Sequence, residues 1–358
     1  MRGYGMRKIG DVGWLEKPAP ECGPLDAIVK PTIIAPCTSD VRVAQGWASA
    51  RVDRILGHEA VGSVVQVGEL VTRFQPGDFV AIPCVTPDWL APGVQRSRTI
   101  GHDTEEEGSF KFVGYKDGVM AELAHVNQAD ANLALIPDGV APEAALMATD
   151  MMATGLRGAE AADIQFGDTV VIIGIGPVGL MALAGAILRG AGQVIAAGGR
   201  EVTRKVARQY GASDVIRYDD GRYGHATPSD ILVTRILQRT GQVDKVIVAG
   251  GDTETLAMAV RLVKPGGIVS NINFYDQATS LTIPMPDWGL GMADKDIRGS
   301  FCPGGGVQLA ALLQLIKHGR IDPTKLITHE FHGFTALPDA FDVMARKPPD
   351  LIKPIVYM

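Results

Sequence analysis

Apolar residues in the middle of the chain alternate between short β-branched runs and longer helical patterns. The first such run, Val-Val-Ile-Ile at 170–173, is typical of a strand that is buried on both faces. Further strand patterns follow, with helical patterns between them, at 194–197, 214–218, 246–249 and 268–272. Strands that alternate with helices in this way predict a doubly wound parallel sheet of the Rossmann kind over residues 151–297.

The first 150 residues show a different pattern. Short apolar runs are broken by Pro and Gly, and Gln75-Pro-Gly-Asp78 has the composition of a turn between two strands. This pattern predicts a β-rich, barrel-like domain, with a polar connection over 86–118. Residues 298–358 contain one strong helical pattern at 307–318 and are predicted to fold back onto this domain. The prediction is therefore an α/β protein with one domain over 1–150 and 298–358 and a second over 151–297.

Composition and charge narrow the class of protein. The chain has 358 residues, of which 46% are hydrophobic and 21% charged, and its net charge is −6. This balance argues against nucleic acid or an anionic membrane as the main partner. Its four scattered cysteines lack CxxC spacing, and the N-terminal residues lack a signal-peptide pattern, so a cytoplasmic protein is expected.

The first strand pattern is followed by a glycine motif, Gly174-x-Gly176-x-x-Gly179, with Pro177 and Val178 inside it. The order strand, glycine turn, helix is the context of a dinucleotide-binding fingerprint. The first glycine permits a tight turn, the second lets a pyrophosphate approach the backbone, and the third allows close packing of helix and strand. A glycine-rich turn that binds nothing is the alternative.

The end of the second strand bears on the choice of nicotinamide cofactor. An NAD enzyme needs an acidic residue there to bind the adenosine ribose. This chain has Gly198, Gly199 and Arg200 instead. The glycines leave space, and the arginine can bind a 2′-phosphate, so NADP is predicted over NAD. The alternative is that Arg200 only begins a helix and faces solvent.

Three residues far apart in the sequence have the chemistry of metal ligands. Cys37, His58 and Asp150 offer a thiolate, an imidazole and a carboxylate. Three protein ligands with a fourth position open make a catalytic zinc site. Spacing alone leaves other interpretations open, because a buried cysteine is often a small hydrophobe and Asp150 could cap a helix.

Several motifs together resemble one family, and the resemblance extends over nearly the whole chain. The motifs are Gly57-His58-Glu59-Ala60-Val61-Gly62, Pro76-Gly77-Asp78 and Gly174-Ile-Gly-Pro-Val-Gly179. They resemble the zinc-dependent medium-chain alcohol dehydrogenases, whose catalytic domain is GroES-like. Further motifs resemble the tetrameric bacterial NADP-dependent secondary-alcohol dehydrogenases, namely Cys37-Thr-Ser-Asp40, Thr86-Pro-Asp-Trp89, Thr149-Asp150-Met-Met and Lys353-Pro354.

The resemblance implies roles for particular residues. Cys37, His58 and Asp150 match the catalytic zinc ligands, Glu59 a carboxylate near the metal, and Ser39 the hydroxyl that begins proton transfer. Further implied cofactor contacts are Tyr218, Asn273 and Lys347. The implied substrate pocket consists mostly of apolar residues, namely Cys84, Val85, Trp89, Phe110, Met151, Thr154, Phe274, Phe301 and Cys302.

The resemblance also implies one catalytic zinc per chain, a homotetramer, and small uncharged ketones, aldehydes and secondary alcohols as substrates. No structural zinc is expected, because residues 85–118 contain no cysteine. Arg42 stands where relatives often have a relay histidine, and an arginine does not relay protons at neutral pH.

Alternatives remain at this stage. They are a metal-free quinone or enoyl reductase, a polyol dehydrogenase, and a non-enzymatic protein that binds NADPH.

Overall fold

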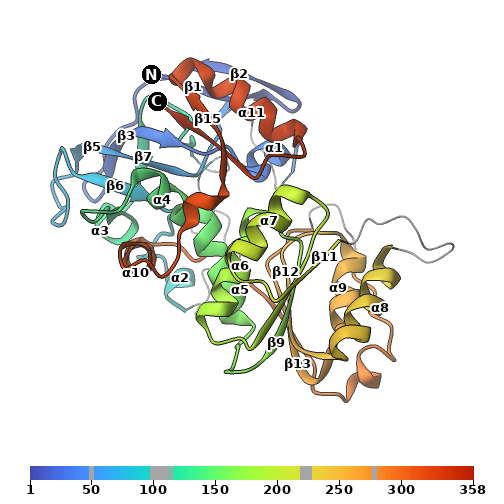
Figure 1. Ribbon diagram of the computed structural model, residues 1–358. Coiled ribbons are helices and arrows are strands. Elements are labelled where there is room, and N and C mark those ends of the chain that lie inside the picture. The colour runs from blue at the N-terminus through green and yellow to red at the C-terminus, as the bar shows by residue number, and fades with distance from the viewer. Residues whose placement is uncertain (48–51, 97–111, 113–115, 218–227, 276–279) are drawn as a thin grey trace. The chain divides into compact units, whose positions relative to one another are not determined.

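The computed structural model describes residues 1–47, 52–96, 112, 116–217, 228–275 and 280–358 (Figure 1). Phe110, Tyr218 and the acidic run at 103–107 lie outside these residues. The chain divides into two compact units, of which the first comprises Met1–Ala153 with Cys302–Met358 and the second Thr154–Phe301. Within the described ranges, no helix is long and apolar enough to cross a membrane.

The second unit is built on a six-stranded parallel sheet, which confirms the predicted Rossmann fold. The strands lie in the order β11 (Asp214–Ile216), β10 (Gln193–Ala197), β9 (Thr169–Ile173), β12 (Val243–Val248), β13 (Val263–Asn271) and β14 (Asp296–Gly299). Numbered along the chain, this is the order 3-2-1-4-5-6 of a doubly wound sheet. The strand order reverses between β9 and β12, which run parallel, and such folds bind ligands at this point, beyond the carboxyl ends of the strands.

Helices cover both faces of this sheet. The helices are α5 (Ala153–Ala161), α6 (Pro177–Leu188), α7 (Glu201–Gln209), α8 (Pro228–Thr240) and α9 (Thr253–Leu262). Val171 and Ile173 of β9 form one core with residues of α8 and α9, such as Leu232 and Leu256. The alternate residues of β9 face the opposite side, where Figure 1 shows α6 and α7. Burial on both faces explains the unbroken apolar run.

Two details differ from the sequence-based expectation. The strand predicted at 268–272 begins earlier, because β13 starts at Val263, which pairs with Val243 before the register shifts. The sixth strand, β14, was not predicted, because its short sequence Asp-Ile-Arg-Gly has a single apolar side chain, Ile297, which is 38% exposed.

The first unit is β-rich, as predicted. Its larger sheet has the order β15 (Ile327–His332), β16 (Lys353–Tyr357), β3 (Ala27–Ile34), β5 (Ala60–Val67), β6 (Phe79–Ile82) and β8 (Ala134–Leu135), and β7 (Ala124–Val126) also pairs with β3. A second sheet has the order β2 (Asp11–Glu16), β1 (Arg2–Lys8) and β4 (Arg54–Ile55). Val356 of β16 pairs antiparallel with Ile34 of β3, so the C-terminal residues complete the larger sheet.

Short helices connect the strands of the first unit. They are α1 (Thr38–Ala44), α2 (Pro92–Arg96), α3 (Ala129–Asn132), α4 (Pro142–Met147), α10 (Gly306–Lys317) and α11 (Leu337–Arg346), with 3₁₀ turns at Pro323–Leu326 and Phe334–Ala336. A π-helical turn, η1 (Ala148–Met152), joins α4 to α5. The unit has its own core, which includes Met6, Ile34, Leu56 and Met120.

Candidate active site

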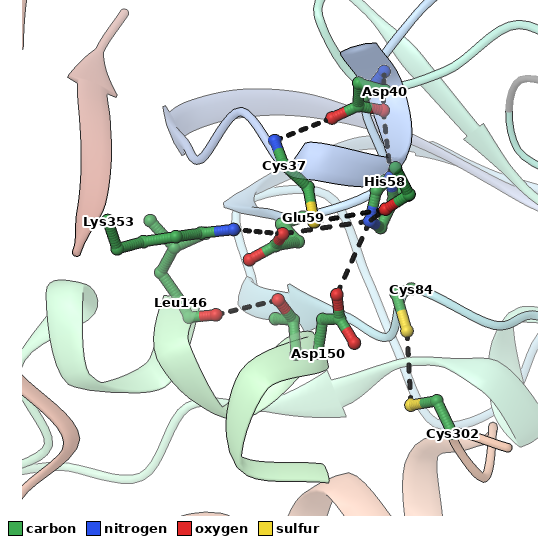
Figure 2. Close-up of polar contacts among 12 residues, drawn as sticks. Cys37, Asp40, His58, Glu59, Cys84, Leu146, Asp150, Cys302 and Lys353 are labelled. Atoms are coloured by element: carbon green, nitrogen blue, oxygen red, sulfur yellow. Dashed lines mark hydrogen bonds and ion pairs between the residues drawn. The ribbon is translucent and has the colours of Figure 1, made fainter. Parts of the chain in front are cut away.

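Four side chains from three separate stretches of the sequence converge in the first unit. They are Cys37, His58, Glu59 and Asp150, all buried, and one potential ligand atom of each lies within 4.8 Å of the others. Figure 2 shows the four side chains directed toward one shared space. We call them the four-residue cluster.

Asp40 connects the segment of Cys37 to the segment of His58. Cys37 directly precedes α1, and its backbone N–H donates to Asp40 Oδ2 at 2.9 Å. Asp40 Oδ1 accepts from Gly57 N at 3.1 Å and lies 3.0 Å from His58 Nδ1. When Nδ1 carries the proton and donates it to the Asp40 carboxylate, the lone pair of Nε2 is available to bind a metal.

The structure thus identifies Asp40 as a residue that sequence reasoning missed. Its signal in the sequence was its position, one helical turn after Cys37.

Asp150 is presented by the π-helical turn η1. Such turns insert an extra residue into a helix and often occur at functional sites. Thr149 Oγ1 donates to Leu146 O at 2.7 Å, and Thr149 O accepts from Cys84 N at 3.1 Å. These bonds hold the turn on both sides of Asp150, whose Oδ2 lies 3.5 Å from His58 Nε2.

Glu59 is paired with Lys353, the first residue of β16. Lys353 Nζ donates to Glu59 Oε1 at 2.5 Å, and both side chains are 0% exposed. Burial raises the pKa of Glu59, although Lys353 opposes this shift. Burial alone would lower the pKa of Lys353, but the negative charges of Cys37, Glu59 and Asp150 raise it overall. The lysine is therefore a fixed positive charge beside the cluster.

The same charges act on Cys37 and His58. Burial favours the neutral thiol of Cys37, but Lys353 and His58 together lower its pKa to about 7. Burial alone would lower the pKa of His58, whereas Asp40 and Asp150 raise it well above its ordinary value. The surroundings thus favour a thiolate at Cys37, which is the form that binds metal.

The cluster has the chemistry of a zinc site. Sulfur, imidazole nitrogen and carboxylate oxygen are the donors that Zn²⁺ binds, and one thiolate with one carboxylate balances the charge of the ion. Glu59 Oε2 is buried and has no hydrogen-bond partner in the described structure, and an unpaired buried carboxylate oxygen is consistent with a site that binds an ion or water. Ser39 Oγ lies at the edge of the cluster, 3.1 Å from Cys37 Sγ and 3.4 Å from His58 Nε2.

In the second unit, the glycine turn joins β9 to α6. Gly174 has φ +87°, and a Cβ there would lie 2.7 Å from the N atom of Gly250, two residues after the end of β12. A Cβ on Gly179 would lie 1.9 Å from Gly174 O, so this glycine is required for close packing. A Cβ on Gly176 would meet nothing within 4 Å. Gly176 therefore lines open space at the N-terminus of α6, which begins with Pro177 and Val178.

The other predicted cofactor residues that the structure describes are divided between the two units. Gly198 follows β10, where a Cβ would lie 2.1 Å from Ile175 Cγ1, and Gly199 leads to Arg200, which precedes the first residue of α7. Asn273 Nδ2 donates to Gly251 O at 3.0 Å. Lys347 is exposed and belongs to the first unit, at the end of α11.

The predicted pocket residues divide between the units. Cys84, Val85, Met151 and Cys302 are buried in the first unit. Trp89, also in this unit, donates from Nε1 to Asn132 Oδ1 at 2.9 Å. Thr154, Phe274 and Phe301 belong to the second unit, and Phe274 is 47% exposed.

Comparisons with known proteins identify the family. Residues 23–138 match the alcohol dehydrogenase GroES-like domain, and residues 177–318 match the zinc-binding dehydrogenases. The chain therefore belongs to the zinc-dependent medium-chain alcohol dehydrogenase family.

Individual relatives are similar over their full length. The chain is 48% identical to the NADP-dependent isopropanol dehydrogenase of Thermoanaerobacter brockii and 47% identical to that of Clostridium beijerinckii, with 100% of each chain covered in both cases. Among solved structures, the apo zinc-dependent alcohol dehydrogenase 2 of Streptococcus pneumonia matches with a TM-score of 0.88 and 26% identity, covering 100% of this chain and 98% of the other.

Proposed function

We propose that this protein is a zinc-dependent oxidoreductase that transfers hydride between NADP(H) and small uncharged secondary alcohols or ketones, and that it also accepts aldehydes. The convergence of Cys37, His58, Glu59 and Asp150 carries this proposal, because a metal-free reductase has no use for such a buried donor set. The relatives named NADP-dependent isopropanol dehydrogenases support the choice of cofactor and of substrate class.

In this proposal Cys37, His58 and Asp150 bind the zinc ion, and Glu59 lies beside it as a fourth potential ligand. Asp40 orients the imidazole of His58 through its contact with Nδ1. Lys353 holds Glu59 by Oε1, and the same oxygen lies 3.7 Å from His58 Nε2. The surrounding residues thus hold the donors in place.

The protein must also move a proton, because alcohol oxidation releases one hydride and one proton. Zinc would polarise the substrate oxygen, and NADP(H) would give or accept the hydride. Ser39 is the proposed proton carrier, since its hydroxyl lies at the edge of the cluster and can both accept and donate. Arg42 stacks over Trp47 at 4.4 Å and takes no part in proton transfer.

We place the cofactor on the second unit. Gly174, Gly176, Pro177, Val178 and Gly179 form the pyrophosphate turn, because Gly176 is open and the helix N-terminus attracts phosphate. The proposed contacts to the rest of the nucleotide are Gly198, Gly199, Arg200, Tyr218, Asn273 and Lys347. Arg200 is the proposed partner of the 2′-phosphate.

We further propose a homotetramer in the cytoplasm. The edge strand β14 leaves Ile297 exposed, and apolar side chains near it in sequence are also exposed, namely Leu281, Met285, Trp288, Leu290 and Met292. An apolar sheet edge of this kind supports pairing with a second copy. The four cysteines are free thiols, which suits a reducing compartment. Light scattering after gel filtration, and fractionation of cells, test the two proposals.

A panel of ketones and aldehydes tests the proposed activity. NADPH oxidation is followed with and without a metal chelator, and bound zinc is counted in each sample. We expect turnover of small ketones, loss of turnover with the chelator, and recovery when zinc is restored. Full activity in a zinc-free sample would overturn the proposal.

A further inference from the structure

Two cysteines touch beside the four-residue cluster. Cys84 Sγ donates to Cys302 Sγ at 3.2 Å, although 218 positions separate the residues in the sequence. The two residues are 2% and 3% exposed. Both sulfurs also lie within 4.8 Å of a carboxylate oxygen of Asp150, which Figure 2 shows between the pair and the rest of the cluster.

The backbone holds this thiol pair together. Cys84 follows β6, and Cys302 lies in the segment before α10. These segments pack closely, since a Cβ on Gly304 would lie 2.5 Å from Val85 O. Neither cysteine lies within a helix or strand, so small local rotations are available to both. A disulfide requires the sulfurs to approach to about 2.0 Å, which is roughly 1 Å closer than they are.

The other two cysteines are engaged elsewhere. Cys22 Sγ donates to Asp26 O at 3.4 Å, and Cys37 belongs to the four-residue cluster. Among the four cysteines, all of which the structure describes, only Cys84 and Cys302 form a sulfur–sulfur hydrogen bond. The pair therefore stands apart as a place where two thiols can react with each other.

We propose that Cys84 and Cys302 are an oxidative modification site, at which a hydroperoxide converts the two thiols into a disulfide beside Asp150. In the first step a sulfur, as thiolate, attacks the peroxide oxygen, a sulfenic acid forms, and the alcohol or water leaves. In the second step the other sulfur attacks the sulfenic sulfur, and water leaves. Two electrons pass from the thiols to the hydroperoxide.

The effect on turnover rests on the proposed function. Both cysteines are predicted pocket residues, and both lie close to the proposed zinc ligand Asp150. Closing the sulfurs moves two pocket walls and changes the surroundings of that carboxylate. The enzyme would then stop using NADPH while hydroperoxide is present and resume when a dithiol reduces the bond.

The test uses the full-length, zinc-loaded protein with hydrogen peroxide. Thiols are counted after denaturation, and linked peptides are identified by mass spectrometry. We expect the four thiols to fall to two, with a link between Cys84 and Cys302, and dithiothreitol to restore all four. Retention of four thiols, or a link between any other pair, would overturn the proposal.

Variants sharpen this test. With Cys84→Ala, the sulfenic acid has no partner, and dimedone should label Cys302. With the matched control Cys22→Ser, three thiols should fall to one and the same link should form. Label on Cys22 or Cys37 in place of Cys302 would contradict the assignment.

Turnover is measured on the same samples, and should fall by about tenfold or more as the link accumulates, since displacements near 1 Å at an active site are costly. A link that leaves turnover unchanged would refute this effect. A protein with no turnover before oxidation would instead refute the proposed function, and the thiol count would still decide the modification site.

Discussion

The two proposed binding regions of this protein are built in opposite ways. The four-residue cluster in the first unit consists of side chains from positions 37, 58, 59 and 150, held by Asp40 and by Lys353 near the C-terminus. The glycine turn in the second unit consists of six consecutive residues, and what it offers a ligand is backbone and open space.

This difference decides how each region tolerates change. The cluster concentrates charge in a buried space, so the loss of one member leaves another charge without a partner. The glycine turn depends on the absence of side chains. One added methyl group disturbs the fold where it meets backbone atoms, and it changes only the binding surface where it meets open space.

Asp150→Ala removes a proposed ligand from the cluster. We expect zinc content to fall and turnover to drop by more than about 100-fold, which exceeds the loss typical of outer-shell partners. NADPH binding, measured by fluorescence titration, should remain, because the second unit is unchanged. The exposed residue Asp138, replaced by alanine, is the control. A variant that keeps its zinc and most of its activity would contradict the ligand assignment.

Lys353→Met leaves Glu59 buried without its cation. We expect the free energy of unfolding, measured in urea, to fall by about 3–5 kcal/mol, as is typical when one partner of a buried pair is removed. The double variant Lys353→Met with Glu59→Gln has no unpaired charge at this position and should regain a large part of that stability. Equal losses in the single and the double variant would show that packing, and not charge, is responsible.

The glycine turn allows fold and binding to be separated. Gly174→Ala places a Cβ at φ +87° against Gly250 and should cost about 2 kcal/mol or more of stability. Gly176→Ala meets no atom within 4 Å, so its stability should change by less than about 0.5 kcal/mol. Its NADPH affinity should nevertheless fall, because the methyl group occupies the space proposed for pyrophosphate. Unchanged affinity in Gly176→Ala would refute that proposal.

Arg200→Ala tests the choice of cofactor. A hydrogen bond to a charged group contributes about 1.5–3 kcal/mol, so the dissociation constant of NADPH should rise by roughly 10- to 100-fold. The constant for NADH, which lacks the 2′-phosphate, should change little. Arg208→Ala, an exposed position in the helix that follows Arg200, is the matched control. Equal losses for both nucleotides would remove the argument for the 2′-phosphate.

Much of the fold could be predicted from the sequence, because its signals are local. The apolar run at 170–173 and the glycines after it predict a buried strand and a turn without reference to the rest of the chain. The strand β14 could not be predicted, because its pairing with β13 is set by the sheet and not by its own residues. The candidate ligands were found as residue types, but spacing alone left each of them with an ordinary alternative.

The sequence by itself determined the first five strands of the parallel sheet, the glycine turn and the residues able to bind a metal, since periodicity and residue chemistry act over a few neighbours. Only the tertiary structure decided that Asp40 fixes His58, that Lys353 neutralises Glu59, and that Cys84 meets Cys302. These contacts join residues up to 294 positions apart. Their geometry depends on how strands and turns pack, and a linear pattern does not encode that packing directly.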